Sequence, residues 1–152
     1  MGANPAYADA LRMIARRELS ERQIRQRLAR RGHAAHDVDT AIATLKAAGA
    51  VDDARVAAII ARAAVSVRKR GRLRVVRQIE AAGIAPDLAR RAADEVFQEI
   101  DPEVLLQAAL QKRLKGSGHI TDDRHHARLY RYLIGQGFEA DAVAALLRRY
   151  RS

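Results

Sequence analysis

A short pattern that occurs three times constrains the fold of this chain more than any other feature of its sequence. Each copy has an apolar residue, three further residues, a glycine and then a residue that we expect to be buried. The glycines are Gly32, Gly83 and Gly137, which lie 51 and 54 residues apart. Helices commonly end at a glycine, because a residue without a Cβ adopts the left-handed conformation without steric strain. The spacing therefore predicts three units of similar length, each with a glycine that separates two helices.

Helix-start and helix-end signals divide the rest of each unit, and no segment has the sustained alternation of a β-strand. Ser20 and Gln23, for example, have the spacing of a capping box at the start of a helix. We predict an all-α fold of nine helices, arranged as three tandem three-helix repeats over residues 1–50 (after a short leader), 51–100 and 101–152. Because each unit is too small to bury its apolar face alone, neighbouring units must stack, and we expect an elongated or curved monomer.

Apolar residues at helical spacing indicate which side of a helix faces the core. The expected inner faces are Leu11, Ile14 and Ala15 in a helix from near Tyr7 to Arg17; Val56, Ile60, Ala63 and Val67 in the helix that follows Asp52; and Leu106, Leu110 and Leu114 in the helix that follows Asp101. Asp52 and Asp101 are themselves favourable N-cap residues, because a carboxylate accepts hydrogen bonds from the first free backbone N–H groups of a helix.

The positive charge of the chain is concentrated in two segments. The net charge is +10, and residues 12–31 and 68–77 each contribute a net +6. Such clusters favour an acidic partner, either nucleic acid or an acidic protein surface, and a merely solvated basic face is the alternative. The candidate partner-binding residues are Arg68, Lys69, Arg70, Arg72, Arg74 and Arg77 in the second segment, and Arg16, Arg17, Arg25, Arg30 and Arg31 in the first.

Within the second segment, Arg70, Arg74 and Arg77 follow one another at helical spacing and are predicted to share one face. No acidic residue lies in the same segment to pair with them. We therefore expect Arg70, Arg72, Arg74 and Arg77 to bind a partner while the fold does not need them. A planar guanidinium suits either phosphate or carboxylate, so the charge pattern alone does not decide between nucleic acid and protein.

The sequence holds no pattern that indicates catalysis. It has no cysteine, which excludes disulfides, thiol catalysis and cysteine metal sites. His125 and His126 are adjacent and point in different directions on a helix, so they lack the spacing of a metal site. A helix-turn-helix over residues 20–45 is disfavoured because its second helix begins with acidic residues. We expect no enzyme activity, no cofactor, no metal and no membrane span, and a cytoplasmic protein because the start lacks a secretory signal.

Several motifs, in order along the chain, resemble those of the RecX family, which regulates the bacterial recombinase RecA. The resemblance covers roughly residues 8–150. It rests on Ala10-Leu11 with Ala15-Arg16-Arg17-Glu18 and Ser20; on Leu28-Ala29-Arg30-Arg31-Gly32; on Gly49-Ala50-Val51-Asp52-Asp53-Ala54-Arg55; on Arg70-Gly71 leading to Ile79 and Gly83-Ile84; and on Tyr132-Leu133 with Gly137-Phe138.

The resemblance implies three tandem three-helix repeats, in agreement with the pattern of glycines. It also implies a non-enzymatic protein that lodges in the groove of the RecA–DNA filament, bridges neighbouring protomers and restrains strand exchange, ATP hydrolysis and co-protease activity, within DNA repair, recombination and the SOS response. A general nucleic-acid-binding protein, which uses the same arginines on the phosphate backbone, remains the alternative, and a weak direct contact with DNA is open in either case.

Overall fold

The structure is a computed structural model that describes residues 4–114 and 118–151, and over these residues it contains nine helices and no strand. Residues 1–3 of the expected leader, residues 115–117 and residue 152 lie outside this description. The helices are α1 (Pro5–Arg16), α2 (Glu21–Arg30), α3 (Ala35–Ala47), α4 (Asp53–Ser66), α5 (Arg72–Ala81), α6 (Pro86–Gln98), α7 (Pro102–Leu114), α8 (Asp123–Gly135) and α9 (Ala140–Arg149).

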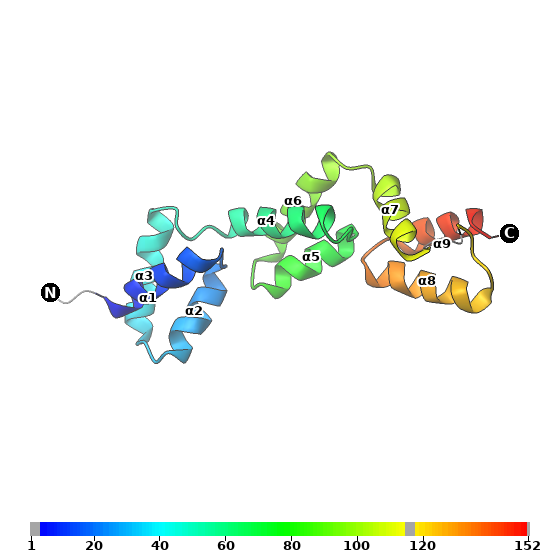
Figure 1. Ribbon diagram of the computed structural model, residues 1–152. Helices are drawn as coiled ribbons and strands as arrows, with labels where there is room; N and C mark the ends of the chain where they lie inside the picture. Colours follow the sequence, from blue (N-terminus) through cyan, green and yellow to red (C-terminus); the bar gives the residue numbers. More distant parts are fainter. Residues whose placement is uncertain (1–3, 115–117, 152) are drawn as a thin grey trace.

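The helices form three groups of three that follow one another along an elongated molecule, with the two termini at opposite ends (Figure 1). We call α1–α3 the first unit, α4–α6 the second and α7–α9 the third. The predicted all-α fold of tandem three-helix repeats is confirmed, whereas the residue boundaries at 50 and 100 remain a proposal.

The repeated glycine pattern is a helix-ending turn. The C=O of Leu28 accepts a hydrogen bond from the N–H of His33 at 3.2 Å, and the C=O of Leu133 accepts one from Phe138 at 3.3 Å. This six-to-one bond closes a Schellman motif, which requires a left-handed residue in between and brings the two flanking side chains together. The left-handed residues are Gly32 (φ +84°), Gly83 (φ +85°) and Gly137 (φ +97°).

The predicted caps at two helix starts are confirmed. The side chain of Ser20 accepts from the N–H of Gln23 at 3.1 Å, and the side chain of Gln23 accepts in return from the N–H of Ser20 at 3.0 Å, which completes the capping box of α2. Asp52 accepts from the N–H of Arg55 at 3.2 Å and caps α4. Both caps satisfy backbone donors that have no partner within the helix.

The predicted inner face of α1 is wrong at two of its three residues, and only Ile14 is partly buried against the core. Leu11 is 41% exposed and Ala15 is exposed, whereas Ala6, Ala10 and Met13 are buried. These three residues also recur at helical spacing, but alanine contributes little to an apolar pattern read from hydrophobicity. A stripe of small side chains lets α1 approach α3 closely, so packing rather than side-chain hydrophobicity decides which face is buried.

The predicted inner face is also partly wrong for α4, but it is correct for α7. Ala63 of α4 is exposed and Val67, the C-cap residue that follows α4, is 68% exposed, so half of the predicted seam faces solvent. The buried residues of α4 are Val56, Ala57, Ala61, Ala64 and Val65. In α7 the prediction is confirmed, because its leucines at 106, 110 and 114 are all buried. The buried face of a helix can be predicted from the sequence when it consists of leucines, but not when it consists mainly of alanines.

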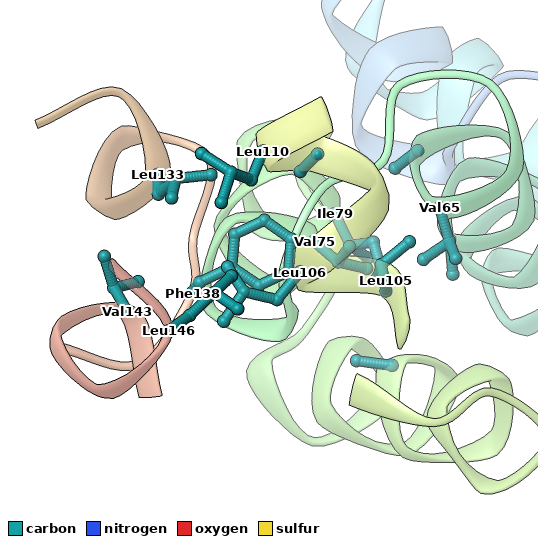
Figure 2. Packing of buried hydrophobic residues seen from close by; sticks show 14 of the residues in the cluster. Val65, Val75, Ile79, Leu105, Leu106, Leu110, Leu133, Phe138, Val143 and Leu146 are labelled. Atoms are coloured by element: carbon teal, nitrogen blue, oxygen red, sulfur yellow. The ribbon is translucent and has the colours of Figure 1, made fainter. Parts of the chain in front are cut away.

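The buried side chains form two clusters along the molecule. One lies within the first unit, between Ala6 and Val51. The other is shared by the second and third units, and Figure 2 shows Phe138 from the α8–α9 turn in the same cluster as Val75 of α5 and Leu106 of α7. The apolar core is therefore continuous from the second unit into the third, and the first unit is attached mainly through polar contacts.

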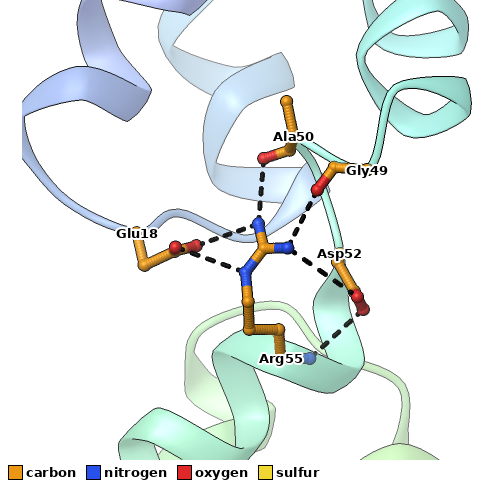
Figure 3. Close-up of polar contacts among 5 residues, drawn as sticks. All are labelled: Glu18, Gly49, Ala50, Asp52 and Arg55. Carbon is orange, nitrogen blue, oxygen red and sulfur yellow. Dashed lines mark hydrogen bonds and ion pairs between the residues drawn. The ribbon is translucent and has the colours of Figure 1, made fainter.

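Arg55, in the first turn of α4, makes the polar attachment of the first unit (Figure 3). Its guanidinium donates to the C=O of Gly49 at 2.8 Å and to the C=O of Ala50 at 3.1 Å, and both oxygens of Glu18 accept from it at 3.3 and 3.4 Å. One planar fork therefore ties the α1–α2 loop and the end of the first unit to the start of the second.

The first and second units also each dock the start of their second helix on the glycine turn of the unit that follows. In the first joint, the hydroxyl of Ser20 donates to the C=O of Ala82 at 2.5 Å. In the second joint, the N–H of Gly71 donates to the C=O of Gln136 at 2.7 Å, and the N–H of Leu73 donates to the C=O of Gly137 at 3.2 Å. Ser20 and Gly71 are the N-cap residues of α2 and α5, and Leu73 lies in the first turn of α5, so both joints place the start of a second helix against a glycine turn.

The third unit differs from the first two in its second helix and in the contacts of its last residues. Its second helix, α8, has thirteen residues, whereas α2 and α5 have ten each. The difference is about one helical turn. The preceding loop is tied to the chain end by a hydrogen bond from the N–H of Ile120 to the C=O of Tyr150 at 2.9 Å, and Arg151 pairs with Asp123.

Candidate partner-binding surface

The densest positive charge lies where α4 passes into α5. Lys69 has a positive φ of +52°, which turns the chain out of α4. Its ammonium donates to the C=O of Ser66 at 3.0 Å, and the side chain of Arg68 is exposed without a partner among the described residues. The turn thus presents two neighbouring cations with no carboxylate between them.

Arg70 is the most constrained of these cations. Its terminal nitrogen donates to the side-chain oxygen of Gln78 at 2.5 Å, and its Nε is buried without a hydrogen-bond partner. Partial burial, then the charges of Arg74 and Arg68, lower the pKa of Arg70 from its usual value. An arginine stays protonated at neutral pH, so the junction holds an uncompensated positive charge that a bound anion would stabilise.

The other three arginines of this segment differ in their contacts. Arg72 pairs with Asp94 of α6 at 2.8 Å, so the expectation that it has no acidic neighbour is wrong. Arg74 donates to the C=O of Gly135 at 3.0 Å and to the side chain of Gln136 at 2.8 Å, which places it in the second joint. Arg77 is exposed and makes only a long contact with the C=O of Leu73 at 3.4 Å.

Arg70 and Arg74 were expected to share one face, and their contacts bear on that expectation. Arg74 donates to Gln136 of the third unit and Arg70 donates to Gln78, so the two have different partners, although their charges lie close enough for Arg74 to lower the pKa of Arg70. Their assignment to partner binding stays a prediction.

The candidate arginines of the first unit also fall into two kinds. Arg25 pairs with Asp39 at 2.6 Å, and Arg31 pairs with Asp9 at 3.1 Å. The side chains of the others are exposed and have no ion pair among residues 4–114 and 118–151; they are Arg16, Arg17 and Arg30. The unpaired cations are those at the end of α1 and the end of α2.

A cavity of about 710 Å³ lies between the first and second units, and we call it the joint hollow. Its rim carries Arg17 from the first unit and Arg68 and Arg70 from the second. Its apolar wall comes from α4. The full lining is Arg17, Glu18, Gln23, Val56, Ile59, Ile60, Ala63, Arg68, Arg70, Gln78, Ala81 and Ala82. The structure thus brings candidate residues from both basic segments to one concave site.

A second cavity, of about 330 Å³, lies between α1 and α2, and we call it the arginine hollow. It is lined by Arg12, Met13, Arg16, Arg17, Arg27 and Arg31. Arg12 and Arg27 were missed by the sequence reasoning. Their positions four residues before Arg16 and Arg31 were a usable signal, because residues at that spacing are neighbours on a helix. Arg17 lines both hollows, so they lie side by side.

Asp9 pairs with two of the arginines that line the arginine hollow. It accepts from Arg12 at 2.5 Å, pairs with Arg31 at 3.1 Å and contacts the ring nitrogen of His33 at 2.6 Å. These contacts, first the hydrogen bond with His33 and then the one with Arg12, lower the pKa of Asp9 from 3.8 to about 2. His33 was predicted to pack like Ile84 and Phe138, and its side chain is only 13% exposed.

The part of the chain that the structure describes contains no group of three or more His, Cys, Asp or Glu side chains able to hold a metal ion. Among the same residues, no helix has the length and apolar character needed to cross a membrane.

The fold and this surface define a helical-repeat protein made of three-helix units, with one basic hollow within the first unit and another where the first unit meets the second. A family profile described as "RecX, first three-helix domain" matches residues 6–45. The chain is 35% identical to the regulatory protein RecX of Halorhodospira halophila over 145 residues, covering 94% of this chain and 87% of that protein. It is 37% identical to the regulatory protein RecX of Acidithiobacillus ferrooxidans over 138 residues, covering 91% and 85%. The chain belongs to the RecX family, as the sequence motifs indicated.

Solved structures show the same fold. The crystal structure of RecX from Lactobacillus salivarius superposes with a TM-score of 0.80 at 14% identity, covering 95% of this chain and 94% of that one. A second crystal structure of regulatory protein RecX gives a TM-score of 0.78 at 18% identity, covering 95% and 70%.

Proposed function

We propose that this chain binds as a monomer in the groove of the RecA filament on DNA and restrains strand exchange, ATP hydrolysis and co-protease activity. In this proposal the protein works in the cytoplasm and acts by binding alone. It catalyses no reaction and uses no cofactor. The observation that carries the proposal is the pair of basic hollows that share Arg17 and open on one elongated molecule. A filament of protein on DNA offers both carboxylates and phosphates within one groove.

Three features of the molecule support this function. An elongated array can follow a groove over more than one protomer, which a sphere of the same mass cannot. The rim residues Arg17 and Arg68 have no ion pair among the described residues, so partner binding breaks no internal contact there. Units one and two are also held together by the Arg55 fork, which keeps the two hollows in a fixed arrangement.

General binding of nucleic acid is the second candidate, and the arginine hollow favours it. Its lining is five arginines and one methionine, and guanidinium groups suit phosphate oxygens. The two candidates differ in what they require of RecA. A general binder attaches equally to bare and to RecA-coated DNA, and its affinity falls steeply with salt, by a log–log slope of about 0.7–0.9 for each phosphate contacted.

The test compares two double variants with the unmodified chain. Arg17→Ser with Arg68→Ser removes unpaired cations from the joint hollow, and Arg128→Ser with Arg131→Ser removes two exposed cations from α8. We measure inhibition of RecA ATP hydrolysis on single-stranded DNA, and binding to DNA with and without RecA. We expect the first pair to weaken inhibition by tenfold or more and the second pair to leave it unchanged. Equal binding to bare and coated DNA would replace the filament function by the general one.

A further inference from the structure

We propose that the joint hollow binds a short acidic protein segment that carries a bulky aliphatic side chain between its carboxylates. This proposal deepens the proposed function, because it assigns the chemistry of the partner segment that this chain recognises. It rests on the combination of an aliphatic wall with an arginine rim, in a cavity of about 710 Å³. Ligand sites in proteins commonly have volumes of roughly 300–1,000 Å³.

The wall of the joint hollow is aliphatic and partly open to solvent. Ile59 is 38% exposed, Ala63 is exposed, and Ile60 and Val56 continue the same face of α4 inward. No residue in the lining is aromatic. Covering Ile59 removes apolar surface from water, which a purely ionic ligand cannot do.

The rim supplies positive charge without internal compensation. The side chains of Arg17 and Arg68 have no carboxylate partner among the described residues, and Arg70 contacts only the amide of Gln78. The one acid in the lining, Glu18, already pairs with Arg55, which is not part of the lining. The rim therefore presents three cations around the aliphatic wall. A ligand with carboxylates on both sides of an aliphatic group would match the cations of the rim and the apolar surface of the wall.

A single-stranded nucleic acid matches the joint hollow less well. Proteins that hold single strands usually stack the bases on aromatic side chains, and this lining has none. The arginine hollow next to it has the opposite character, because only Met13 interrupts its guanidinium groups. The two hollows thus differ in the ligand that they suit, and Arg17 is the residue that they share.

The test uses fluorescence anisotropy with the whole chain and a short fluorescein-labelled peptide, in which one leucine is flanked on both sides by pairs of acidic residues. We expect Ile59→Ser in the chain, or leucine to serine in the peptide, to weaken binding about tenfold, because burial of an aliphatic side chain is lost. Arg17→Ser and Arg68→Ser each weaken binding about two- to fivefold, as exposed ion pairs do.

Matched controls keep the result specific. Val104→Ser removes an aliphatic residue that is 61% exposed on α7, and Arg128→Ser removes an exposed arginine on α8; neither changes peptide affinity. If Ile59→Ser lowers the helical circular-dichroism signal, Ala63→Glu replaces it, because position 63 is an exposed helix position and a carboxylate there repels the peptide. A labelled oligothymidine of similar length serves as the nucleic-acid probe.

The proposal is overturned if the peptide binds the Ile59→Ser and Ala63→Glu variants as well as the unmodified chain. It is also overturned if oligothymidine, and not the peptide, depends on Ile59. These outcomes are separate from failure of the proposed function. A chain that inhibits RecA but ignores the peptide refutes the joint hollow alone, and a chain that binds the peptide but ignores RecA filaments refutes the filament function alone.

Discussion

Replacing Gly71 by alanine tests whether the joint between the second and third units is held by close approach of backbones. Gly71 is the N-cap of α5 and has φ −79° and ψ 166°, a conformation that alanine adopts without strain. A Cβ at this position would lie 2.5 Å from both C and O of Gly137 and 2.7 Å from N of Phe138. All three neighbours are backbone atoms, so the added methyl group is accommodated only if the joint opens.

The size of the effect follows from three contributions. Forcing an extra methyl group into a packed contact costs about 1–3 kcal/mol. Alanine is also a poorer N-cap than glycine, by roughly 0.5–1 kcal/mol. The reduced freedom of the unfolded chain offsets about 0.4–1 kcal/mol. We therefore expect a net loss of about 1–3 kcal/mol, which for a chain of this length lowers the melting temperature by about 2–12 °C.

Gly32→Ala is the matched control, because it separates steric contact from backbone strain. Gly32 has φ +84°, and a Cβ there meets nothing within 4 Å. The same chemical change thus introduces left-handed strain of about 1–2 kcal/mol but leaves both joints intact.

Amide hydrogen exchange distinguishes the two variants. The amides of Gly71 and Leu73 donate across the joint to Gln136 and Gly137, so Gly71→Ala should accelerate exchange at positions 71 and 73, and Gly32→Ala should not. Unchanged protection at both amides, together with an unchanged melting temperature, would show that the joint tolerates a Cβ and that the close-approach argument is wrong.

Three further predictions concern the first two units. Gly83→Val should destabilise more than Gly32→Ala does in a thermal melt, because φ is +85° and a Cβ at position 83 would lie 2.6 Å from Cδ of Arg22; an equal shift would exclude the steric part. Asp9→Asn should lower the melting temperature at pH 7, and the gap to the unmodified chain should close as the pH falls from 4 toward 2. The reason is that a carboxyl with its pKa lowered to about 2 stabilises the fold above pH 3.8 and loses that effect on protonation. Arg55→Ala should increase the radius of gyration in small-angle scattering, since it removes the fork between the first two units; an unchanged radius would show that Ser20 and its neighbours suffice.

The features that the sequence predicted well are local ones. A capping box or a glycine-ended helix is decided within six residues, so Ser20 with Gln23, and the turns at Gly32 and Gly137, follow from the residues themselves. The inner face of α1 is not local in this sense. It is chosen by how closely α3 approaches, and alanine at positions 6 and 10 permits that approach without adding a hydrophobic signal.

The candidate surface was predictable as a charge excess but not as a geometry. That Arg17 and Arg68 line one cavity depends on the joint between two units, and the contacts of that joint include a backbone carbonyl, which no side-chain pattern reveals. The pairing of Arg72 with Asp94 likewise depends on how α5 packs against α6. Sequence spacing gives the neighbours of a residue along its own helix, and the partners across helices come only with the fold.

Some of the candidate arginines make contacts within the fold and others do not, and this difference decides which substitutions can test the surface. Removing Arg70, Arg72, Arg74 and Arg77 together, as the charge pattern suggests, would delete an ion pair with α6 and the side-chain contacts of the second joint along with any partner contact. Loss of RecA inhibition in that variant would then have two explanations, an open joint or a missing charge. Arg68, which makes no such contact, separates them, because its removal changes the charge of the joint hollow and leaves the hydrogen bonds of both joints in place.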